Sequence, residues 1–383
     1  MTPSADDTVC DVVIAGGGPA GSATALTLLR QGASVVLTDP VAADPGRRPE
    51  WKLGESLAPR ARPLLERLGV IGRVARGPHT PCFGNQSSWG GTVLTDDAFL
   101  YDPHGVGWHL DRAHFDRTLF QAACAAGAGR RAHSVRAVRR VRDHWRLMLG
   151  GETIRARYLV DATGAGAGVA RRVGAAVQRE DRLIALAARL PPGGAPQQPS
   201  RTSLVESAAH GWWYAAPLPD GTSLAMLMTD ADLVAEHALH RPRNWWAGLM
   251  ATTHVRARVG HPDPAMVRLR IVRAATAHTL PAAGPGWAAV GDAATAADPI
   301  AGRGILTALA TGVTAAQAVG ADAAGDRGAL GRYAERVLAI HTEYLHARAV
   351  CYRAEDRWNT RFWIRRRSPS PERADGPGPG PGG

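Results

Sequence analysis

The sequence predicts an α/β fold in which a Rossmann-like domain carries an inserted antiparallel-sheet domain and C-terminal helices. Three observations predict it: an opening strand–glycine turn–helix–strand unit, a central series of short strand-like runs, and helical periodicity over the last third. The chain has 383 residues, of which 45% are hydrophobic, enough for two packed cores.

The opening unit is a βαβ motif. An apolar run over 9–15 predicts a strand, 16–21 is the glycine turn, 22–31 is an apolar helix and 33–38 is the second strand. A helix between two such strands predicts that they pair in parallel.

The middle of the chain predicts a hairpin ribbon followed by a second sheet. Strand-like runs cover 133–141, 144–149 and 153–160, and polar or glycine residues separate them. Residues 183–275 then alternate short strands with Pro/Gly turns, which is typical of an inserted sheet.

The last third begins with a buried strand over 287–290. A long Ala-rich helix is expected from about Gly304, and 333–358 has helical spacing of its large apolar side chains. The Ser/Pro/Gly composition of 368–383 predicts disorder.

Composition limits the function classes. The net charge is +11, but arginine is spread along the chain, so an acidic substrate or partner is favoured over nucleic acid. The cysteines are far apart, which favours reduced thiols and predicts no metal site. We expect a cytoplasmic protein, because the N-terminus lacks a signal pattern and no window approaches the roughly 20 apolar residues of a membrane span.

The glycine turn is a dinucleotide-binding pattern, because it follows a strand and opens a helix. Glycines here permit the tight turn, the approach of a pyrophosphate and close helix–sheet packing, and a carboxylate at the end of the second strand accepts ribose hydroxyl protons. The predicted cofactor residues of this unit are Gly16, Gly18, Pro19, Ala20, Gly21 and Asp39.

Later segments discriminate between NAD and FAD. The GDAA run at 291–294, followed by DPIAGRG at 298–304, resembles the second FAD fingerprint of the p-hydroxybenzoate hydroxylase-like FAD monooxygenase superfamily. The resemblance implies that Asp292, with Gly291, binds the ribityl chain. It also implies that Pro299, Gly302 and Gly304 pass under the isoalloxazine ring, where a helix N-terminus stabilises negative charge on the reduced flavin.

Two further segments carry this resemblance. The DATG run that begins at Asp161 resembles a degenerate middle fingerprint, and Arg112 matches an arginine that contacts FAD in these proteins. Arg112 is alternatively an ordinary arginine at a helix start. The resemblance implies a GR2-type FAD domain, here 1–80, 105–182 and 276–330, a substrate domain at 81–104 and 183–275, and a helical segment at 331–367.

The segment WKLGESL at 51–57 resembles the GES stretch of flavin-dependent halogenases, and GWWYAAPL at 211–218 lies where halogenases carry a WxWxIP pattern. Halogenases also need a lysine well downstream of GES. Lys52 is the only lysine of this chain and precedes that motif. Because arginine stays protonated and is a poor nucleophile, it cannot substitute, so hydroxylation is favoured over halogenation.

The combination of these motifs resembles the flavoprotein maturases of quinone-cofactor amine and amino-acid oxidases, such as lysine ε-oxidase and glycine oxidase. These are regarded as tryptophan hydroxylases that act on a partner polypeptide. The motifs do not separate this group from natural-product hydroxylases.

The expected chemistry follows from the flavin. Reduced flavin and O2 give a C4a-hydroperoxide whose distal oxygen attacks an indole or phenol, while the protein excludes water, orients the ring and supplies a proton. No separate NAD(P)H domain is visible, so NAD(P)H binds transiently or a partner reductase delivers reduced flavin.

Each candidate residue has a second interpretation. Aromatic side chains for substrate stacking are Trp89, Trp212, Trp213 and Tyr214, which are alternatively sheet-core residues. Catalytic candidates are Lys52, Glu55 and Ser56, alternatively an exposed lysine and a structural loop. His109 is a proton relay or a structural histidine.

Three other functions stay open at this point. They are an oxygen-independent flavin reductase resembling geranylgeranyl reductases, a natural-product hydroxylase or halogenase, and a non-catalytic maturation chaperone. The substrate is correspondingly an aromatic small molecule or a partner polypeptide.

Overall fold

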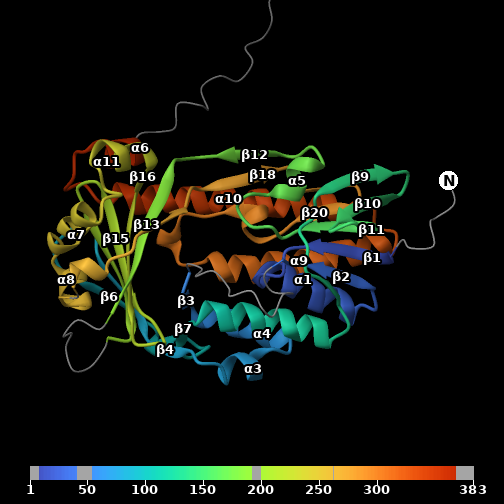
Figure 1. Cartoon of the computed structure of the whole chain (residues 1–383), viewed down its shortest axis with the longest axis horizontal. Coiled ribbons are helices and arrows are strands. Elements are labelled where there is room, and N and C mark those ends of the chain that lie inside the picture. Colours follow the sequence, from blue (N-terminus) through green and yellow to red (C-terminus); the bar gives the residue numbers. More distant parts are fainter. Residues whose placement is uncertain (1–7, 41–53, 192–199, 262, 368–383) are drawn as a thin grey trace, which may run out of the picture.

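The computed structural model describes residues 8–40, 54–191, 200–261 and 263–367. Figure 1 shows two sheets at opposite ends of an elongated molecule, with the long helix α10 (Ala329–Arg353) running between them along one side. Strands β12 (Ala176–Arg179) and β18 (Ala277–Leu280) bridge the same two ends.

In the described part of the chain, an eight-stranded sheet forms the cofactor end. Its main path is β19-β20-β11-β1-β2-β8, and all neighbours except β19 and β20 pair in parallel. The strands are β1 Thr8–Ala15, β2 Val35–Thr38, β8 Gly129–Arg131, β11 Glu152–Asp161, β19 Ala283–Gly284 and β20 Trp287–Ala289. The predicted βαβ unit and parallel pair are confirmed.

The sheet is covered by α1 (Pro19–Arg30), α4 (Arg112–Ala125) and α9 (Gly304–Ala323). Helix α1 begins three residues earlier than predicted, because Pro19 fits the first helical position and needs no N–H partner there. A Cβ at Gly312 of α9 would lie 2.5 Å from the Ala20 carbonyl oxygen, so glycine permits the close α1–α9 contact.

The apolar length of α9 requires a correction. Its 20 residues are long and apolar enough to cross a membrane, contrary to the sequence expectation, but 56% of its most apolar window is buried inside the protein. Packing against α1 and the sheet explains this composition, which is typical of a core helix.

The hairpin ribbon branches from β11. Strand β10 (His144–Leu149) pairs with β11 on one side and with β9 (Ala137–Val141) on the other, both in antiparallel register, as predicted. Strand β9 begins four residues later than expected, and Arg136 already makes a single backbone bond to Met148.

The other end holds a sheet that has seven strands among the described residues, in the order β17-β13-β16-β15-β14-β5-β6. All neighbours are antiparallel except β14 and β5. The strands are β5 Gly84–Ser88, β6 Thr95–Ala98, β13 Leu183–Leu190, β14 Thr202–Ala208, β15 Gly211–Pro217, β16 Ser223–Asp230 and β17 Arg270–Arg273. The residue ranges given above for the domains stay a prediction.

Each face of this sheet has its own core. One face packs on short helices between β16 and β17 that the sequence interpretation missed, and the other packs on the C-terminal helices. The missed helices are α6 Ala231–Glu236, α7 Pro242–Met250 and α8 His254–Val259. Helices this short carry too few turns for a clear 3.6-residue period, so the Pro and Gly residues around them favoured a strand-and-turn interpretation.

Two small sheets connect the ends. One has the order β3-β7-β4 and the other β12-β18-β21. Their remaining strands are β3 Ser56–Leu57, β4 Thr80–Cys82, β7 Gly107–His109 and β21 Thr295–Ala296, and the remaining helices are α2 Arg62–Arg67, α3 Ile71–Ala75 and α5 Gly168–Arg172.

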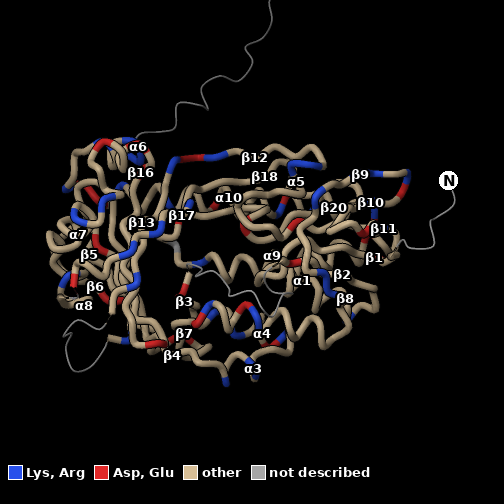
Figure 2. The backbone as a smooth tube through the Cα atoms, in the orientation of Figure 1, with Lys and Arg blue, Asp and Glu red and all other residues tan. Residues whose placement is uncertain are grey.

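The C-terminal segment is α10 followed by α11 (Arg361–Arg367). Helix α10 starts four residues before and ends five residues before the predicted 333–358 helix, and Trp358 lies in the turn that follows it. The predicted disorder of 368–383 lies outside the described residues. Figure 2 shows basic and acidic residues interspersed over both ends of the molecule, in keeping with the dispersed arginines of the sequence.

Candidate functional site

The glycine turn after β1 is shaped by close backbone contacts. Gly16 has a φ of +114°, and a Cβ at Gly21 would overlap the Gly16 carbonyl oxygen. Among the described residues, a Cβ at Gly18 would meet nothing within 4 Å, and no side chain caps the α1 N-terminus that begins there. The open space in front of bare helix N–H groups fits a pyrophosphate.

Asp39 closes this turn from the neighbouring strand. Its Oδ2 accepts a hydrogen bond from Gly17 N at 2.8 Å. The carboxylate therefore lies beside the turn at the end of β2, where the sequence interpretation predicts a ribose contact.

Asp292 lies at the second fingerprint, just after β20. Burial raises the pKa of Asp292, and the Arg112 guanidinium opposes that shift, yet the residue is solvent-exposed. The side chain of Asp292 is thus open to solvent and within reach of the Arg112 charge. The positions of Asp292 and Arg112 thus fit a polar chain held between the two fingerprints.

The α9 N-terminus lies at the end of the same segment. Gly302 adopts the left-handed conformation at φ +59°, a Cβ at Gly302 or at Gly304 would meet nothing within 4 Å, and no side chain caps the helix. Pro299 begins the 3-10 turn Pro299–Ala301 before it. This open helix end fits the pyrimidine edge of a flavin.

Arg112 joins the cofactor side to the segment that contains GES. It opens α4, its Nη1 donates to the Gly54 carbonyl oxygen at 3.1 Å, and its Nη2 pairs with Asp116 at 3.2 Å. Gly54 has a φ of +95°, and a Cβ there would lie 2.8 Å from Arg112 Nη1. These contacts tie the start of α4 to the segment that contains GES, and the FAD contact of Arg112 stays a prediction.

Asp161 has a different environment from the other predicted cofactor residues. It is fully buried at the end of β11, where Oδ1 accepts from Thr163 and Oδ2 accepts from the N–H groups of Val169 and Ala170. The carboxylate holds the turn into α5, so its hydrogen bonds stabilise the loop beside the glycine turn.

Glu55, Ser56 and Tyr214 form a polar cluster between the two ends of the molecule, which we call the GES cluster. Ser56 Oγ and Tyr214 Oη lie 2.8 Å apart. Glu55 is 2% exposed, its Oε2 accepts from Gly54 N, and Oε1 has no hydrogen-bond partner among the described residues.

Burial controls the protonation of this cluster. It raises the pKa of Glu55 to about 7, against the opposing charge of Arg112, and the pKa of Tyr214 is raised by burial and by the Glu55 charge. A carboxyl group that titrates near neutral pH is suited to general acid–base chemistry.

His109 adjoins the GES cluster. It pairs with Ser56 in the β3–β7 ladder, so the two side chains share one face. His109 is fully buried, and burial lowers its pKa to about 4, against the opposing effect of a backbone hydrogen bond at Arg201. A neutral imidazole beside Ser56 is compatible with either predicted role.

The predicted aromatic residues separate into two groups. Trp212 and Trp213 are fully buried on opposite faces of the sheet, and Trp213 packs against Trp245 at 5.1 Å. Trp89 packs on Trp363 at 5.2 Å and donates its Nε1–H to the Cys351 carbonyl oxygen. The sheet-core interpretation describes these tryptophans, and only Tyr214 reaches the GES cluster.

Lys52 lies outside the described residues, and a surface hollow lies apart from the groups described so far. The hollow, of about 320 Å³, is lined by Asp11, Gln31, Arg157 and Gly320, at the end of β1 opposite the glycine turn. Ligands of parallel sheets bind at the carboxyl ends of the strands, so this hollow is not the cofactor site.

Helix α10 contributes polar residues that the sequence interpretation did not single out. His341, Tyr344, Arg348 and Tyr352 are spaced by three or four residues and share one face of the helix, a signal present in the sequence. We call this face the α10 seam. It contacts Asp298 of the second fingerprint through three of these residues.

The contacts of the seam are short and buried. Tyr352 Oη donates to Asp298 Oδ2 at 2.6 Å and accepts from Trp212 Nε1 at 3.0 Å, while Asp298 N donates to Tyr344 Oη at 2.8 Å. Arg348 pairs with Asp181 at 2.6 Å and lies 3.6 Å from Asp298. The seam therefore fixes the loop that leads into α9.

Comparison with known proteins places the chain among flavoproteins. The family model described as "Tryptophan halogenase" matches residues 92–375. A protein of Marinomonas mediterranea described as "Putative FAD-dependent oxidoreductase LodB" is 27% identical over 366 residues, which are 93% of this chain and 96% of that relative.

Two solved structures are similar over most of the chain. The myxobacterial chondrochloren halogenase CndH has a TM-score of 0.83 and 22% identity, covering 95% of this chain and 87% of that one. The peptidyl tryptophan dihydroxylase QhpG, described as essential for tryptophylquinone cofactor biogenesis, has a TM-score of 0.77 and 24% identity, with coverage of 94% and 79%. At these identities the likeness establishes the fold, and the predicted fold class is confirmed.

Proposed function

The chain belongs to the tryptophan halogenase family, and from this premise we propose that it is an FAD-dependent monooxygenase that hydroxylates an aromatic ring. Family membership confirms the halogenase-like branch predicted from the sequence, and with it an FAD-dependent oxidoreductase. We propose an indole as the ring, carried by a tryptophan of a partner polypeptide.

The observation that carries hydroxylation is the GES cluster in a chain whose only lysine is Lys52. The lysine expected of a halogenase, downstream of GES, is missing. The GES cluster instead offers a buried carboxyl group, Glu55, whose pKa is raised to about 7, and the Ser56–Tyr214 pair. A carboxyl group that can be ionised near neutral pH suits removal of the proton that the ring carbon loses when it gains oxygen.

The reaction divides between cofactor and protein. When bound and reduced, FAD activates O2 for transfer of one oxygen atom to an electron-rich ring. Asp39 and the bare α1 N-terminus would hold the pyrophosphate–ribose part, and Asp292 with Arg112 would hold the ribityl part. Glu55 Oε1 would accept the proton that the ring carbon loses when it gains oxygen, and Tyr214 and Ser56 would orient the ring.

The peptidyl substrate is supported by similarity to QhpG, which is described as a peptidyl tryptophan dihydroxylase. For the electron donor, we propose a separate flavin reductase or transiently bound NAD(P)H, because the described residues form a single sheet with a run of parallel strands.

The test is product analysis. The protein is supplied with chemically reduced FAD, air, and either a tryptophan-containing peptide or free indoles, with chloride and bromide present. Mass spectrometry is expected to show products that are one oxygen atom heavier and contain no halogen. Halogenated products without hydroxylated ones, or equal turnover under strict anaerobiosis, would overturn the proposal.

A further inference from the structure

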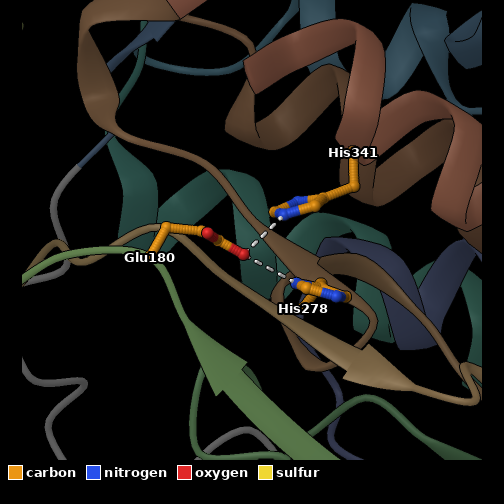
Figure 3. Close-up of side chains that lie close together, drawn as sticks. All are labelled: Glu180, His278 and His341. Atoms are coloured by element: carbon orange, nitrogen blue, oxygen red, sulfur yellow. Dashed lines mark hydrogen bonds and ion pairs between the residues drawn. The ribbon is translucent and has the colours of Figure 1, made fainter. Parts of the chain in front are cut away.

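Glu180, His278 and His341 come together where the two ends of the molecule meet, away from the flavin fingerprints in sequence. Glu180 follows β12, His278 lies in β18 and His341 lies on the α10 seam. Figure 3 shows the two imidazole rings converging on one carboxylate oxygen. We propose that these residues form a binding site for a divalent transition metal ion of the Zn²⁺ class, which we call the crossover site.

The distances fit shared coordination. Glu180 Oε1 lies 3.3 Å from His278 Nδ1 and 3.5 Å from His341 Nε2, and all three atoms lie within 4.8 Å of one another. Metal bonds of 2.0–2.1 Å at tetrahedral angles separate ligand atoms by about 3.3 Å. Both measured distances match this value, and the two nitrogens would move together by at most about 1.5 Å.

The surroundings of the crossover site support a metal. Thr295 Oγ1 lies 3.0 Å from His341 Nδ1, the nitrogen that does not face Glu180. Metal-binding histidines ordinarily bond an oxygen through this other nitrogen, which fixes the ring orientation. Glu180 itself is positioned by its backbone N–H, which donates to the Thr276 carbonyl oxygen.

The three side chains of the crossover site differ in how far they are buried. The side chain of His341 is 2% exposed, that of His278 is 8% exposed and that of Glu180 is 24% exposed. A metal would therefore enter past the carboxylate, and the imidazoles would bind it from the interior. Two imidazoles and a carboxylate select Zn²⁺ and its neighbours over Mg²⁺ or Ca²⁺, which prefer oxygen ligands.

The arrangement of the His278 and His341 rings favours uncharged imidazoles. The ring centroids of His278 and His341 lie 4.1 Å apart, with an interplanar angle of 32°. Two positive rings at this distance would repel each other, whereas neutral imidazoles can each give a lone pair to one cation. Arg348, on the same face of α10, adds to this repulsion of positive charge on His341.

A bound metal would tie three segments together. It would connect the crossover strand β12, the strand β18 and helix α10, next to the β21 segment that leads to Asp298. Its expected role is therefore structural, holding the α10 seam against the loop before α9. Because binding occurs only in the folded state, it would raise the melting temperature.

The test uses the full chain without a histidine tag, stripped with a chelator and supplied with Zn²⁺ alone. After gel filtration, elemental analysis is expected to find one Zn²⁺ per chain, and competition with a chromophoric chelator gives the affinity. We expect His278→Gln and His341→Gln to lower the affinity at least about 100-fold, and Glu180→Gln and Thr295→Ala by about 10-fold or more.

The matched control is His210→Gln. His210 and His237 also form a close imidazole pair, with ring centroids 4.0 Å apart, but they lie outside the three-ligand group. This variant should bind Zn²⁺ like the wild type. Zn²⁺ should also raise the melting temperature of the wild type and of His210→Gln by a few °C, but not that of His278→Gln.

Glu180→Gln keeps the test decisive if a histidine variant fails to fold, because Glu180 is partly exposed and glutamine has the same shape. Retention of less than a tenth of an equivalent by the folded wild type would overturn the crossover site. So would equal Zn²⁺ affinity in the wild type and in folded Glu180→Gln and His278→Gln.

Discussion

The cofactor turns and the GES cluster differ in the chemical groups that form them. The turns are built from backbone: Gly16, Gly18 and Gly21 leave no side chain in the path, and α1 and α9 present uncapped N-termini. The GES cluster is built from side chains, with Glu55 and Tyr214 held in a buried setting. The first region should therefore be sensitive to added volume, and the second to changed chemistry at constant volume.

The largest effect is expected from Gly21→Ala. The new Cβ would overlap the Gly16 carbonyl oxygen, and the turn would have to open. FAD affinity should fall by about 100-fold or more, equivalent to about 3 kcal/mol, as measured by flavin fluorescence. Gly331→Ala in α10 is the control, since its Cβ would meet nothing within 4 Å, and it should bind FAD normally. Tight FAD binding by Gly21→Ala would show that the turn tolerates volume.

The next effect tests chemistry without volume. Glu55→Gln keeps the shape of the side chain and removes its proton transfer, so turnover with an aromatic substrate should fall about 10²-fold. FAD affinity should stay within about twofold of the wild type, because Glu55 is not among the cofactor turns. An unchanged rate in a variant that binds FAD normally would remove Glu55 from the reaction.

The same substitution predicts a pH effect on stability. Burial raises the pKa of Glu55 from 4.5 to about 7, so the folded protein holds a proton that the unfolded chain releases. The contribution of Glu55 to stability is therefore fully present below pH 4.5 and is lost as pH rises through about 7. Cofactor-free Glu55→Gln should exceed the wild type by up to about 3 kcal/mol at pH 8, with little difference at pH 4.5.

Denaturant unfolding of both proteins across this pH range measures that difference. If the two stability curves run parallel from pH 4.5 to 8, the carboxyl group does not change its ionisation within the folded protein over that range.

Trp213 and Tyr214, which are adjacent in β15 and face opposite sides of the sheet, allow a test of which face meets the substrate. Trp213→Phe removes volume from the core on the far face and should lower the free energy of unfolding by about 1–3 kcal/mol with unchanged kcat/KM. Tyr214→Phe removes the hydroxyl bonded to Ser56 and should cost only about 1 kcal/mol, while kcat/KM falls. Chemical unfolding and steady-state kinetics on both variants separate the two faces, and the reverse pattern would place the reaction on the Trp213 side.

The smallest effect concerns the α10 seam. Tyr352→Phe removes one hydroxyl that bonds Trp212 and Asp298, and it should lower stability by about 1–2 kcal/mol. FAD affinity should fall with it by a few-fold, because the loop before α9 loses a contact. Thermal unfolding and flavin titration measure both, and a stability loss without any change in FAD affinity would uncouple the seam from the loop.

Local patterns predicted the cofactor end well. The βαβ unit, the ribbon of 144–149 and 153–160, and the helix from Gly304 depend on neighbours within about twenty residues, so their periodicity and glycines suffice. The short helices between β16 and β17 were missed, because their helical character comes from packing Trp245 and Leu249 on the sheet rather than from a long repeat.

The aromatic residues of β15 show a limit of prediction from sequence patterns. The run Trp212-Trp213-Tyr214 was correctly placed on a strand, but a strand alternates its side chains, and only the packing of each face tells which one meets a substrate. Trp213 faces α7 and Tyr214 faces the GES cluster.

The sequence by itself determined the fold class, the dinucleotide turn and the flavin fingerprints, because these are contiguous segments in which spacing and chemistry coincide. Only the tertiary structure decided which distant groups meet: Glu55 and Ser56 with Tyr214, Asp298 with Tyr352, and Glu180 with His278 and His341. A contact between residues about 50 to 160 positions apart leaves no local period. Burial, which sets the pKa of Glu55 and the orientation of His341, exists only once the chain has folded.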